Sequence, residues 1–101
     1  MKIYLREIKE RFPEFEIRNY DENAYFVGFN HDSRTIQANE IFIPIIGENF
    51  DGHDFILQAL SSGASMSLCE SKNSLVVKDA DKPVIFVDSI QEGLQKILNY
   101  A

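Results

Sequence analysis

The chain has 101 residues, a formal net charge of −6 and 45% hydrophobic residues. A chain of this length buries about two thirds of its extended surface, enough for one domain with its own core. Sixteen acidic against ten basic residues, with no cluster of Lys or Arg, argue against binding of long nucleic acids. No apolar run approaches the ~18 residues of a membrane span, and no signal-peptide core follows Met1. The single cysteine, Cys69, cannot form an internal disulfide, so we expect one domain over residues 1–101 in a reducing, cytoplasmic setting.

The first half of the chain predicts one short helix and three strands. Residues 4–12 place apolar side chains at helical spacing, and Pro13 ends this helix. Strands are predicted over 15–18 and 24–29, with a polar turn between them. Residues 41–46 form a continuous apolar run that is too short for a helix. This run predicts a buried strand in which Pro44 disrupts the ladder or marks an edge.

The second half predicts helices that alternate with strands. A helix over 54–62 would end at a left-handed Gly63 and bury four residues: Phe55, Ile56, Ala59 and Leu60. Strands follow over 65–69 and 84–87, separated by a polar stretch. Ser89 to Glu92 fits a capping box and begins a last helix with four apolar positions: Ile90, Leu94, Ile97 and Leu98. The alternation predicts an α/β fold, a three-layer sandwich in which helices flank a mixed β-sheet.

Two loops carry residues that suit an anionic or nucleotide ligand. In the first, residues 31–34, the hydroxyl of Ser33 and the guanidinium of Arg34 can hold a phosphate. The same residues also suit a purely structural turn. Asp32 would then close an Asx turn, Ser33 would cap it, and Arg34 would pair with a nearby carboxylate. The residues alone leave both interpretations open.

The second loop, Gly47 to His53, is framed by glycines and leads directly into a helix. Such a loop offers free backbone N–H groups where the helix N-terminus favours negative charge. Asn49 can match the edge of a pyrimidine base, and Phe50 can stack on it. Alternatively, the glycines only shape a tight turn, Phe50 covers the core, and Asp51 or His53 caps the helix.

A metal site and a nucleophilic cysteine are weaker alternatives. Asp51, His53 and Asp54 place carboxylate and imidazole ligands close together. However, Asp54 is expected to begin the helix, and no distant His or Cys cluster supports a metal. Cys69 lies in or at the end of an apolar strand, where a buried, inert thiol is expected. We therefore predict no metal, no cofactor and no catalytic residue on this chain.

The order of several short motifs closely resembles the N-terminal domain of the Mur ligases, which build the peptide of the bacterial cell-wall precursor. The motifs lie in residues 32–36, 41–44, 47–56, 59–64 and 83–88, the last followed by a helix with Leu94. Together they cover about residues 25–100. The run I-P-x-x-G-E-N-x-D-G-H, starting at Ile43, looks most like the MurF type, which adds D-alanyl-D-alanine to UDP-N-acetylmuramoyl-tripeptide. The MurE type, which adds the third amino acid, shares D-S-R and D-G-H and is the alternative.

The resemblance implies a division of labour between domains. This chain would be the substrate-binding N-terminal domain of a larger ligase and would hold the uridine diphosphate end of UDP-N-acetylmuramoyl-peptide. The ATP-binding and C-terminal domains, absent from this chain, would supply the ATP and Mg²⁺ sites. We therefore expect the isolated chain to be inactive, to contact the ATP-binding domain of the same polypeptide, and to bind neither nucleic acid nor membrane. The other alternative is a stand-alone, non-catalytic nucleotide-sugar binding module.

Carried over position by position, the resemblance assigns substrate contacts to five residues: His31, Ser33, Glu48, Asn49 and Phe50. It assigns support of the two loops to six more: Asp32, Arg34, Gly47, Asp51, Gly52 and His53. Glu48 and Asp51 would lie near a diphosphate, so uridine recognition through backbone groups, Ser33 and Asn49 is expected to dominate. The sequence departs from the family at Ala38-Asn39-Glu40, where Gly-Asp is usual. Asn39 can adopt the left-handed conformation that glycine would supply.

Overall fold

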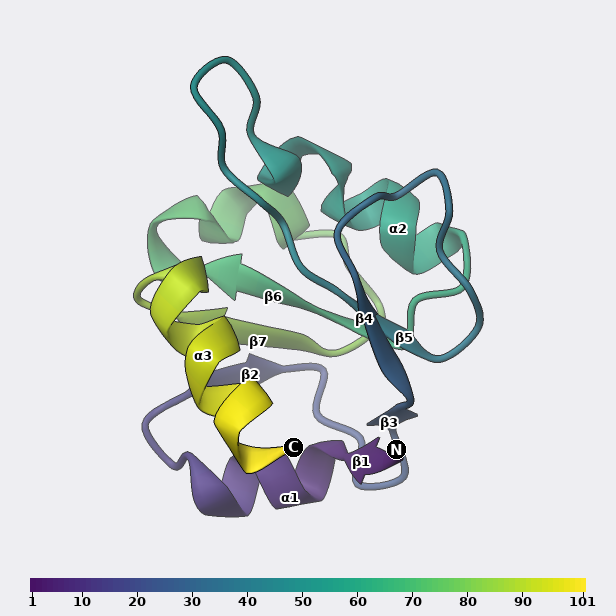
Figure 1. Cartoon of the computed structure of the whole chain (residues 1–101), viewed down its shortest axis with the longest axis vertical. Coiled ribbons are helices and arrows are strands. Elements are labelled where there is room, and N and C mark those ends of the chain that lie inside the picture. The colour runs from purple at the N-terminus through teal and green to yellow at the C-terminus, as the bar shows by residue number, and fades with distance from the viewer.

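A computed structural model describes all residues, 1–101, and its centre is a five-stranded mixed sheet (Figure 1). The strand order is β2 (Glu16–Arg18), β7 (Val84–Val87), β6 (Met66–Glu70), β5 (Glu40–Phe42) and β4 (Gly28–Asn30). Strands β4, β5, β6 and β7 run parallel to one another, whereas β2 pairs with β7 in antiparallel orientation. A separate two-stranded antiparallel sheet pairs β1 (Ile3–Tyr4) with β3 (Tyr25–Phe26).

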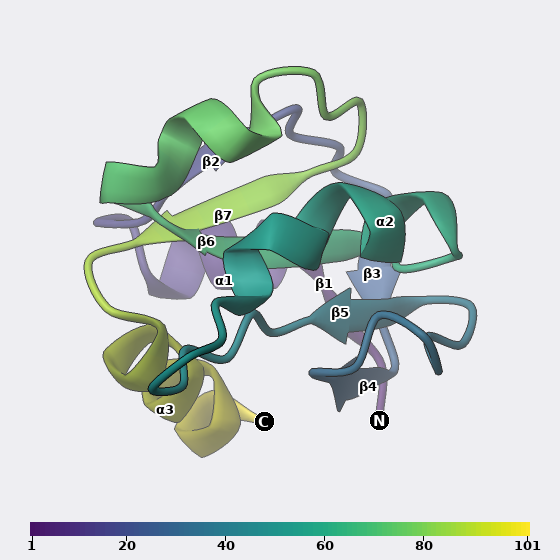
Figure 2. The same cartoon turned by 90° about the horizontal axis from the view of Figure 1, so that it is seen from above.

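Helices cover the sheet on both sides, as Figure 2 shows, and the predicted three-layer α/β sandwich is confirmed. One side carries α3 (Ile90–Tyr100), with α1 (Leu5–Arg11) packed beside it, where the Tyr100 hydroxyl donates to a Glu7 carboxylate oxygen at 2.6 Å. The other side carries α2 (Ile56–Ser61) and two 3₁₀ helices, η1 (Gly52–Phe55) and η2 (Ser71–Val77). None of these helices combines the length and apolar character that crossing a bilayer requires.

Two hydrophobic cores lie on opposite faces of the sheet because strand side chains alternate. On β7, Ile85 and Val87 join the core under α1 and α3, whereas Val84 and Phe86 join the core under α2 and η2. All residues of β6 and β7 are buried. These two strands are therefore the centre of the molecule, as expected for parallel strands covered on both faces.

Several predicted elements have different bounds. The strand expected over 24–29 is two strands in two sheets, and at the break the Val27 N–H donates to the Asn39 carbonyl at 2.8 Å. The strand expected over 41–46 ends at Phe42, because Pro44 has no N–H for the ladder and the chain turns into a hairpin. The helix expected from Asp54 begins earlier, as η1. Strand β1 and the 3₁₀ helix η2 were not anticipated.

The predicted turn chemistry is confirmed at three positions. Asn39 adopts a φ of 65°, the left-handed conformation expected of it in place of glycine. Gly63 has a φ of 122° just after α2. At the start of α3 the Ser89 hydroxyl oxygen accepts from the Glu92 N–H, which is one of the two hydrogen bonds of the predicted capping box.

Candidate functional site

A cavity lies between the loop that follows β4 and the hairpin that follows β5. These two strands are parallel neighbours, so their carboxyl ends meet at one edge of the sheet. The cavity has a volume of about 640 Å³, within the range of small-molecule sites. It is lined by nine residues: His31, Asp32, Ser33, Arg34, Phe42, Ile45, Phe50, Phe55 and Gln58.

The first loop is a turn held by hydrogen bonds of its own polar side chains. Asn30, at the end of β4, accepts from the Asp32 N–H and donates to Glu40 and Thr35. The Asp32 carboxylate accepts from the Arg34 N–H and binds the Arg34 guanidinium through both oxygens, at 3.0 Å each. The Asx turn and the ion pair of the structural interpretation are therefore both present. The side chains of His31 and Ser33 take no part in these bonds and line the cavity.

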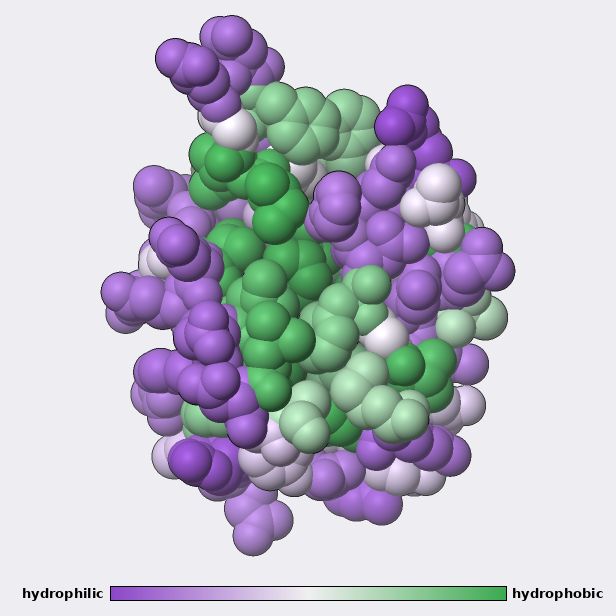
Figure 3. All heavy atoms as spheres, in the orientation of Figure 1, coloured by the Kyte–Doolittle hydropathy of each residue, from purple (hydrophilic) through white to green (hydrophobic).

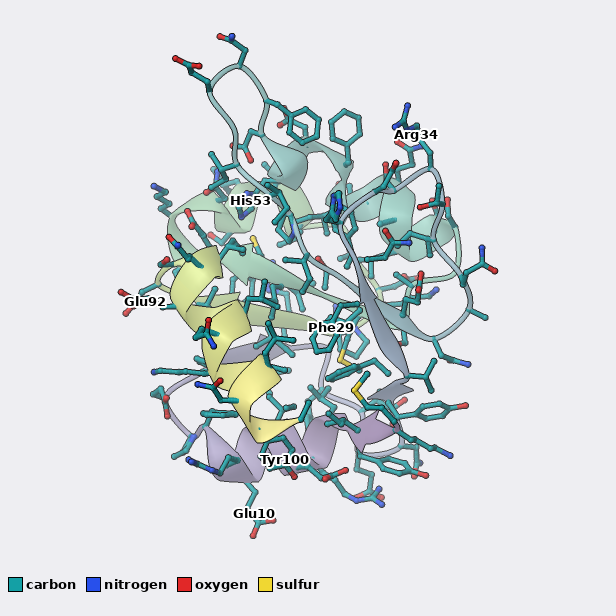
Figure 4. The ribbon with its side chains drawn as sticks, viewed as in Figure 1. Glu10, Phe29, Arg34, His53, Glu92 and Tyr100 are labelled. Carbon is teal, nitrogen blue, oxygen red and sulfur yellow. The ribbon has the colours of Figure 1, made fainter.

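The Asp32–Arg34 pair also changes the charge behaviour of the loop. Hydrogen bonds from the Arg34 side chain and backbone lower the pKa of Asp32 from 3.8 to about 2. The same carboxylate raises the pKa of Arg34. The Arg34 side chain remains 82% exposed and extends outward at the rim, as Figure 4 shows. It is a cation at the mouth of the cavity.

Ser33 is the only polar residue of the cavity lining that is buried, with 7% of its surface exposed. Its hydroxyl makes no hydrogen bond within the chain, yet it is not among the buried polar atoms sealed from solvent. The cap that the structural interpretation assigned to Ser33 is therefore absent. A hydroxyl in this position is available to a ligand in the cavity.

The second loop is a tight hairpin that projects from the sheet edge (Figure 1). The Gly47 N–H donates to the Phe50 carbonyl at 2.7 Å, and the Gly52 N–H donates to the Ile45 carbonyl at 2.8 Å. A Cβ at Gly52 would lie 2.6 Å from the Ile45 nitrogen, so only glycine allows this close approach. The two tip residues, Glu48 and Asn49, are exposed and do not line the cavity.

Phe50 faces the cavity rather than the core, contrary to the structural interpretation. Its ring stacks on that of Phe55 with centroids 5.5 Å apart and an interplanar angle of 13°. Phe50 is 51% exposed and Phe55 36% exposed. Two parallel, half-exposed aromatic rings form an apolar wall on which a planar ligand group can pack.

Below the hairpin, His53 is buried and fully hydrogen-bonded. Its Nε2 accepts from the Glu70 N–H at 2.9 Å, so the ring proton lies on Nδ1, which donates to Asp51 at 2.9 Å. Asp51 also caps η1 by accepting from the His53 N–H, and this bond is the main cause that lowers its pKa. Both ring nitrogens are therefore engaged in hydrogen bonds that join the hairpin to the end of β6. Figure 4 labels His53 at this position.

The structure thus brings together five of the residues singled out in the sequence: His31, Asp32, Ser33, Arg34 and Phe50. Glu48 and Asn49 lie apart from them at the hairpin tip. Four lining residues were missed: Phe42, Ile45, Phe55 and Gln58. Phe55 was expected in the buried stripe of its helix, but it precedes the α-helix proper. Gln58, three positions later, lies on the same helical face and could have been found from that spacing.

The sequence matches the model of the Mur ligase family, described as its catalytic domain, over residues 25–101. A diaminopimelate-adding UDP-N-acetylmuramoyl-L-alanyl-D-glutamate ligase of Rickettsia typhi is 37% identical over 85 residues. That match covers 84% of this chain and 16% of the relative. A UDP-N-acetylmuramoyl-tripeptide–D-alanyl-D-alanine ligase of Bacillus subtilis is 33% identical over 76 residues, which are 75% of this chain and 16% of the relative. The chain thus spans about a sixth of each relative's length.

Solved structures of MurF superpose on this chain. A crystal structure of MurF from Acinetobacter baumannii superposes with a TM-score of 0.73 and 16% identity, covering 96% of this chain and 20% of that protein, which supports the fold. MurF of Thermotoga maritima in complex with ADP has a TM-score of 0.58 and 32% identity, covering 68% of this chain and 15% of that protein. The family match extends over most of the chain, and the fold agrees with it. The chain belongs to the Mur ligase family.

Proposed function

We propose that this chain is the substrate-binding N-terminal domain of an ATP-dependent Mur ligase of peptidoglycan synthesis. Its cavity holds the uridine end of UDP-N-acetylmuramoyl-peptide. The observation that carries the proposal is the pairing, in one cavity, of the unbonded Ser33 hydroxyl with the stacked rings of Phe50 and Phe55. A hydroxyl and an aromatic wall suit a planar base joined to a polar sugar.

The charges around the cavity determine how the diphosphate binds. Arg34 at the rim is already paired with Asp32, so the local net charge of the pair is zero. Glu48 is exposed at the hairpin tip, outside the cavity lining. The domain has few free cations for a diphosphate, and much of that stabilisation comes from elsewhere in the full protein. Binding of UDP to this domain alone is therefore weak, and the base and ribose provide most of it.

The ATP and Mg²⁺ that the full ligase would use belong, in this proposal, to residues outside this chain. The sequence contains no G-x-x-x-x-G-K-[ST] loop, and no group of three or more His, Cys, Asp or Glu could hold a metal. We assign both to another domain of the full polypeptide, and with them the bond-forming step. The isolated domain is then inactive as a ligase.

The proposal extends to the identity of the amine that the full enzyme adds. The I-P-x-x-G-E-N-x-D-G-H run favours the MurF type, which adds D-alanyl-D-alanine. The 37% identity to a diaminopimelate ligase favours the MurE type as the second candidate. An assay of the full-length protein with ATP separates them. Phosphate release with UDP-MurNAc-tripeptide and D-alanyl-D-alanine supports MurF, and release with UDP-MurNAc-dipeptide and a third amino acid supports MurE.

The binding proposal is tested by titrating uridine and UDP into the protein and following backbone amides by NMR. We expect shifts in residues 31–35 and 47–50. Ser33→Ala removes a hydroxyl with no partner in the chain, so affinity falls about three- to tenfold, the value of one hydrogen bond, while stability is unchanged. Ser74→Ala, outside the cavity, is the control and leaves affinity unchanged. No shift in either loop, or full affinity in Ser33→Ala, contradicts the proposal.

A further inference from the structure

Two segments of the chain, helix α3 and the residues that follow β5, expose large aliphatic side chains to solvent. On α3, Ile90 and Ile97 are buried against the sheet, but Leu98, also expected on the apolar stripe, is 45% exposed. After β5, the apolar run that predicted a buried strand leaves Ile45 40% exposed and Ile46 48% exposed. These three aliphatic side chains therefore leave a large part of their surface to solvent.

The segment after β5 meets helix α3 on one side of the sheet, because Ile43, two residues before Ile45, belongs to the same core as Ile90 and Ile97. Helix α3 packs over β6 and β7, so it does not cover β5 and β4. Figure 3 shows a continuous apolar strip down the middle of this side, from the hairpin to the end of α3, bordered by hydrophilic residues. Phe29 of β4 points into this region in Figure 4. We define the apolar strip by the half-exposed Ile45, Ile46 and Leu98 together with Phe29 and Leu94, which are partly buried against the core.

We propose that the apolar strip is the surface on which a following domain of the same polypeptide packs. This inference rests on the proposed function, in which the chain is one domain of a longer ligase. The matched relatives devote about five sixths of their length to other residues, since 16% of each aligns here. The C-terminus emerges at the lower end of the strip (Figure 1). A chain continuing from Ala101 reaches the strip without crossing the molecule.

Charge and position favour this occupant over a second copy of the domain. The strip contains no charged residue, so it suits an apolar partner surface. The domain has a net charge of −6, and pairing two copies would bring like charges together. Ile45 belongs both to the strip and to the cavity lining. A domain packed on the strip therefore reaches the rim of the proposed uridine cavity.

The test uses the complete polypeptide encoded by the gene and compares two leucines of similar exposure. Leu98 is 45% exposed on the strip, and Leu57 is 42% exposed on α2, on the opposite side of the sheet. In hydroxyl-radical labelling of the complete protein, we expect Leu98 to react at least about fivefold more slowly than Leu57, because an interface core excludes water. Leu98→Lys should increase the radius of gyration measured by small-angle scattering, whereas the control Leu57→Lys should not.

Three results overturn the inference. Equal labelling of Leu98 and Leu57 means that the strip is exposed in the complete protein. Protection of Leu98 that disappears on dilution means that a second copy covers it. A reading frame that ends at residue 101 leaves no domain to pack there. UDP titration of the unmodified protein keeps the two proposals separate. Absence of UDP binding contradicts the proposed function, whereas the labelling ratio tests only the strip.

Discussion

At the scale of single residues, the ion pair of Asp32 and Arg34 decides how the first loop responds to pH. The pKa of Asp32 is lowered from 3.8 to about 2, chiefly by the Arg34 side chain and then by its backbone N–H. A carboxyl whose folded pKa is depressed stabilises the folded loop fully above its unfolded pKa. This stabilisation is lost as pH falls from about 4 through 2. The loop should therefore stay intact at neutral pH and loosen only in strong acid.

We predict that Arg34→Gln raises the pKa of Asp32 toward 3.8 without reaching it, because the backbone N–H of residue 34 still donates to the carboxylate. The carbon chemical shift of the Asp32 carboxyl, followed against pH by NMR, reports this group alone. That readout is needed because Glu7, Glu14 and Asp51 also have lowered pKa values. Lys72→Gln, far from the loop, should leave the titration unchanged. A midpoint near 3.8 in the unmodified protein would contradict the ion pair.

At the scale of elements, the hairpin after β5 depends on one glycine and tolerates change at the other. A methyl group at Gly52 would lie 2.6 Å from the Ile45 nitrogen and 2.9 Å from the Pro44 Cα, both backbone atoms that cannot rotate away. A methyl group at Gly47 would lie 3.7 Å from its nearest neighbour, an ordinary contact. The two positions thus form a matched pair within one loop.

We predict that Gly52→Ala lowers the free energy of unfolding by about 1–3 kcal/mol, the usual cost of overpacking, and weakens UDP binding because the hairpin carries Phe50. For a chain of this size, each kcal/mol corresponds to a shift of about 4–8 °C in Tm. Gly47→Ala should change stability by no more than about 0.5 kcal/mol. Urea denaturation of the two variants measures the difference. Equal stability of both would show that the backbone near Ile45 can move aside.

How far the sequence predicts these elements depends on how strong their local signals are. The strands expected at 65–69 and 84–87 and the last helix agree with β6, β7 and α3 to within one residue at the strand ends. Their signals are local: alternation in the first strand, an all-apolar run in the second, and helical spacing with a cap in the helix. The pair β1 and β3 could not be predicted, because two-residue strands carry no period and exist only through their pairing. For the site, the loops after β4 and β5 had to converge once those strands were parallel neighbours. The sequence predicts a tight turn framed by glycines but not the direction of its tip, which leaves Asn49 outside the cavity lining.

At the scale of the whole molecule, the two cores share β6 and β7, so neither can be lost without exposing the other face of the same strands. We therefore expect the domain to unfold in one cooperative step. Cys69 on β6 is a natural reporter of that step. It is completely buried, and desolvation raises the pKa of its thiol to about 11. The native thiol is therefore both inaccessible and scarcely ionised at pH 8, whereas an unfolded thiol is reactive there.

We predict that alkylation of Cys69 proceeds only through global unfolding. When refolding is faster than labelling, the labelling rate is the rate of the unfolded thiol multiplied by the unfolding equilibrium constant. The free energy obtained from this ratio should equal that from urea denaturation. Gly52→Ala should accelerate labelling about tenfold for each 1.4 kcal/mol that it removes from stability. Protein in concentrated urea gives the reference rate. If the folded protein labels faster than its unfolding free energy allows, β6 opens locally, and the two cores do not form one cooperative unit.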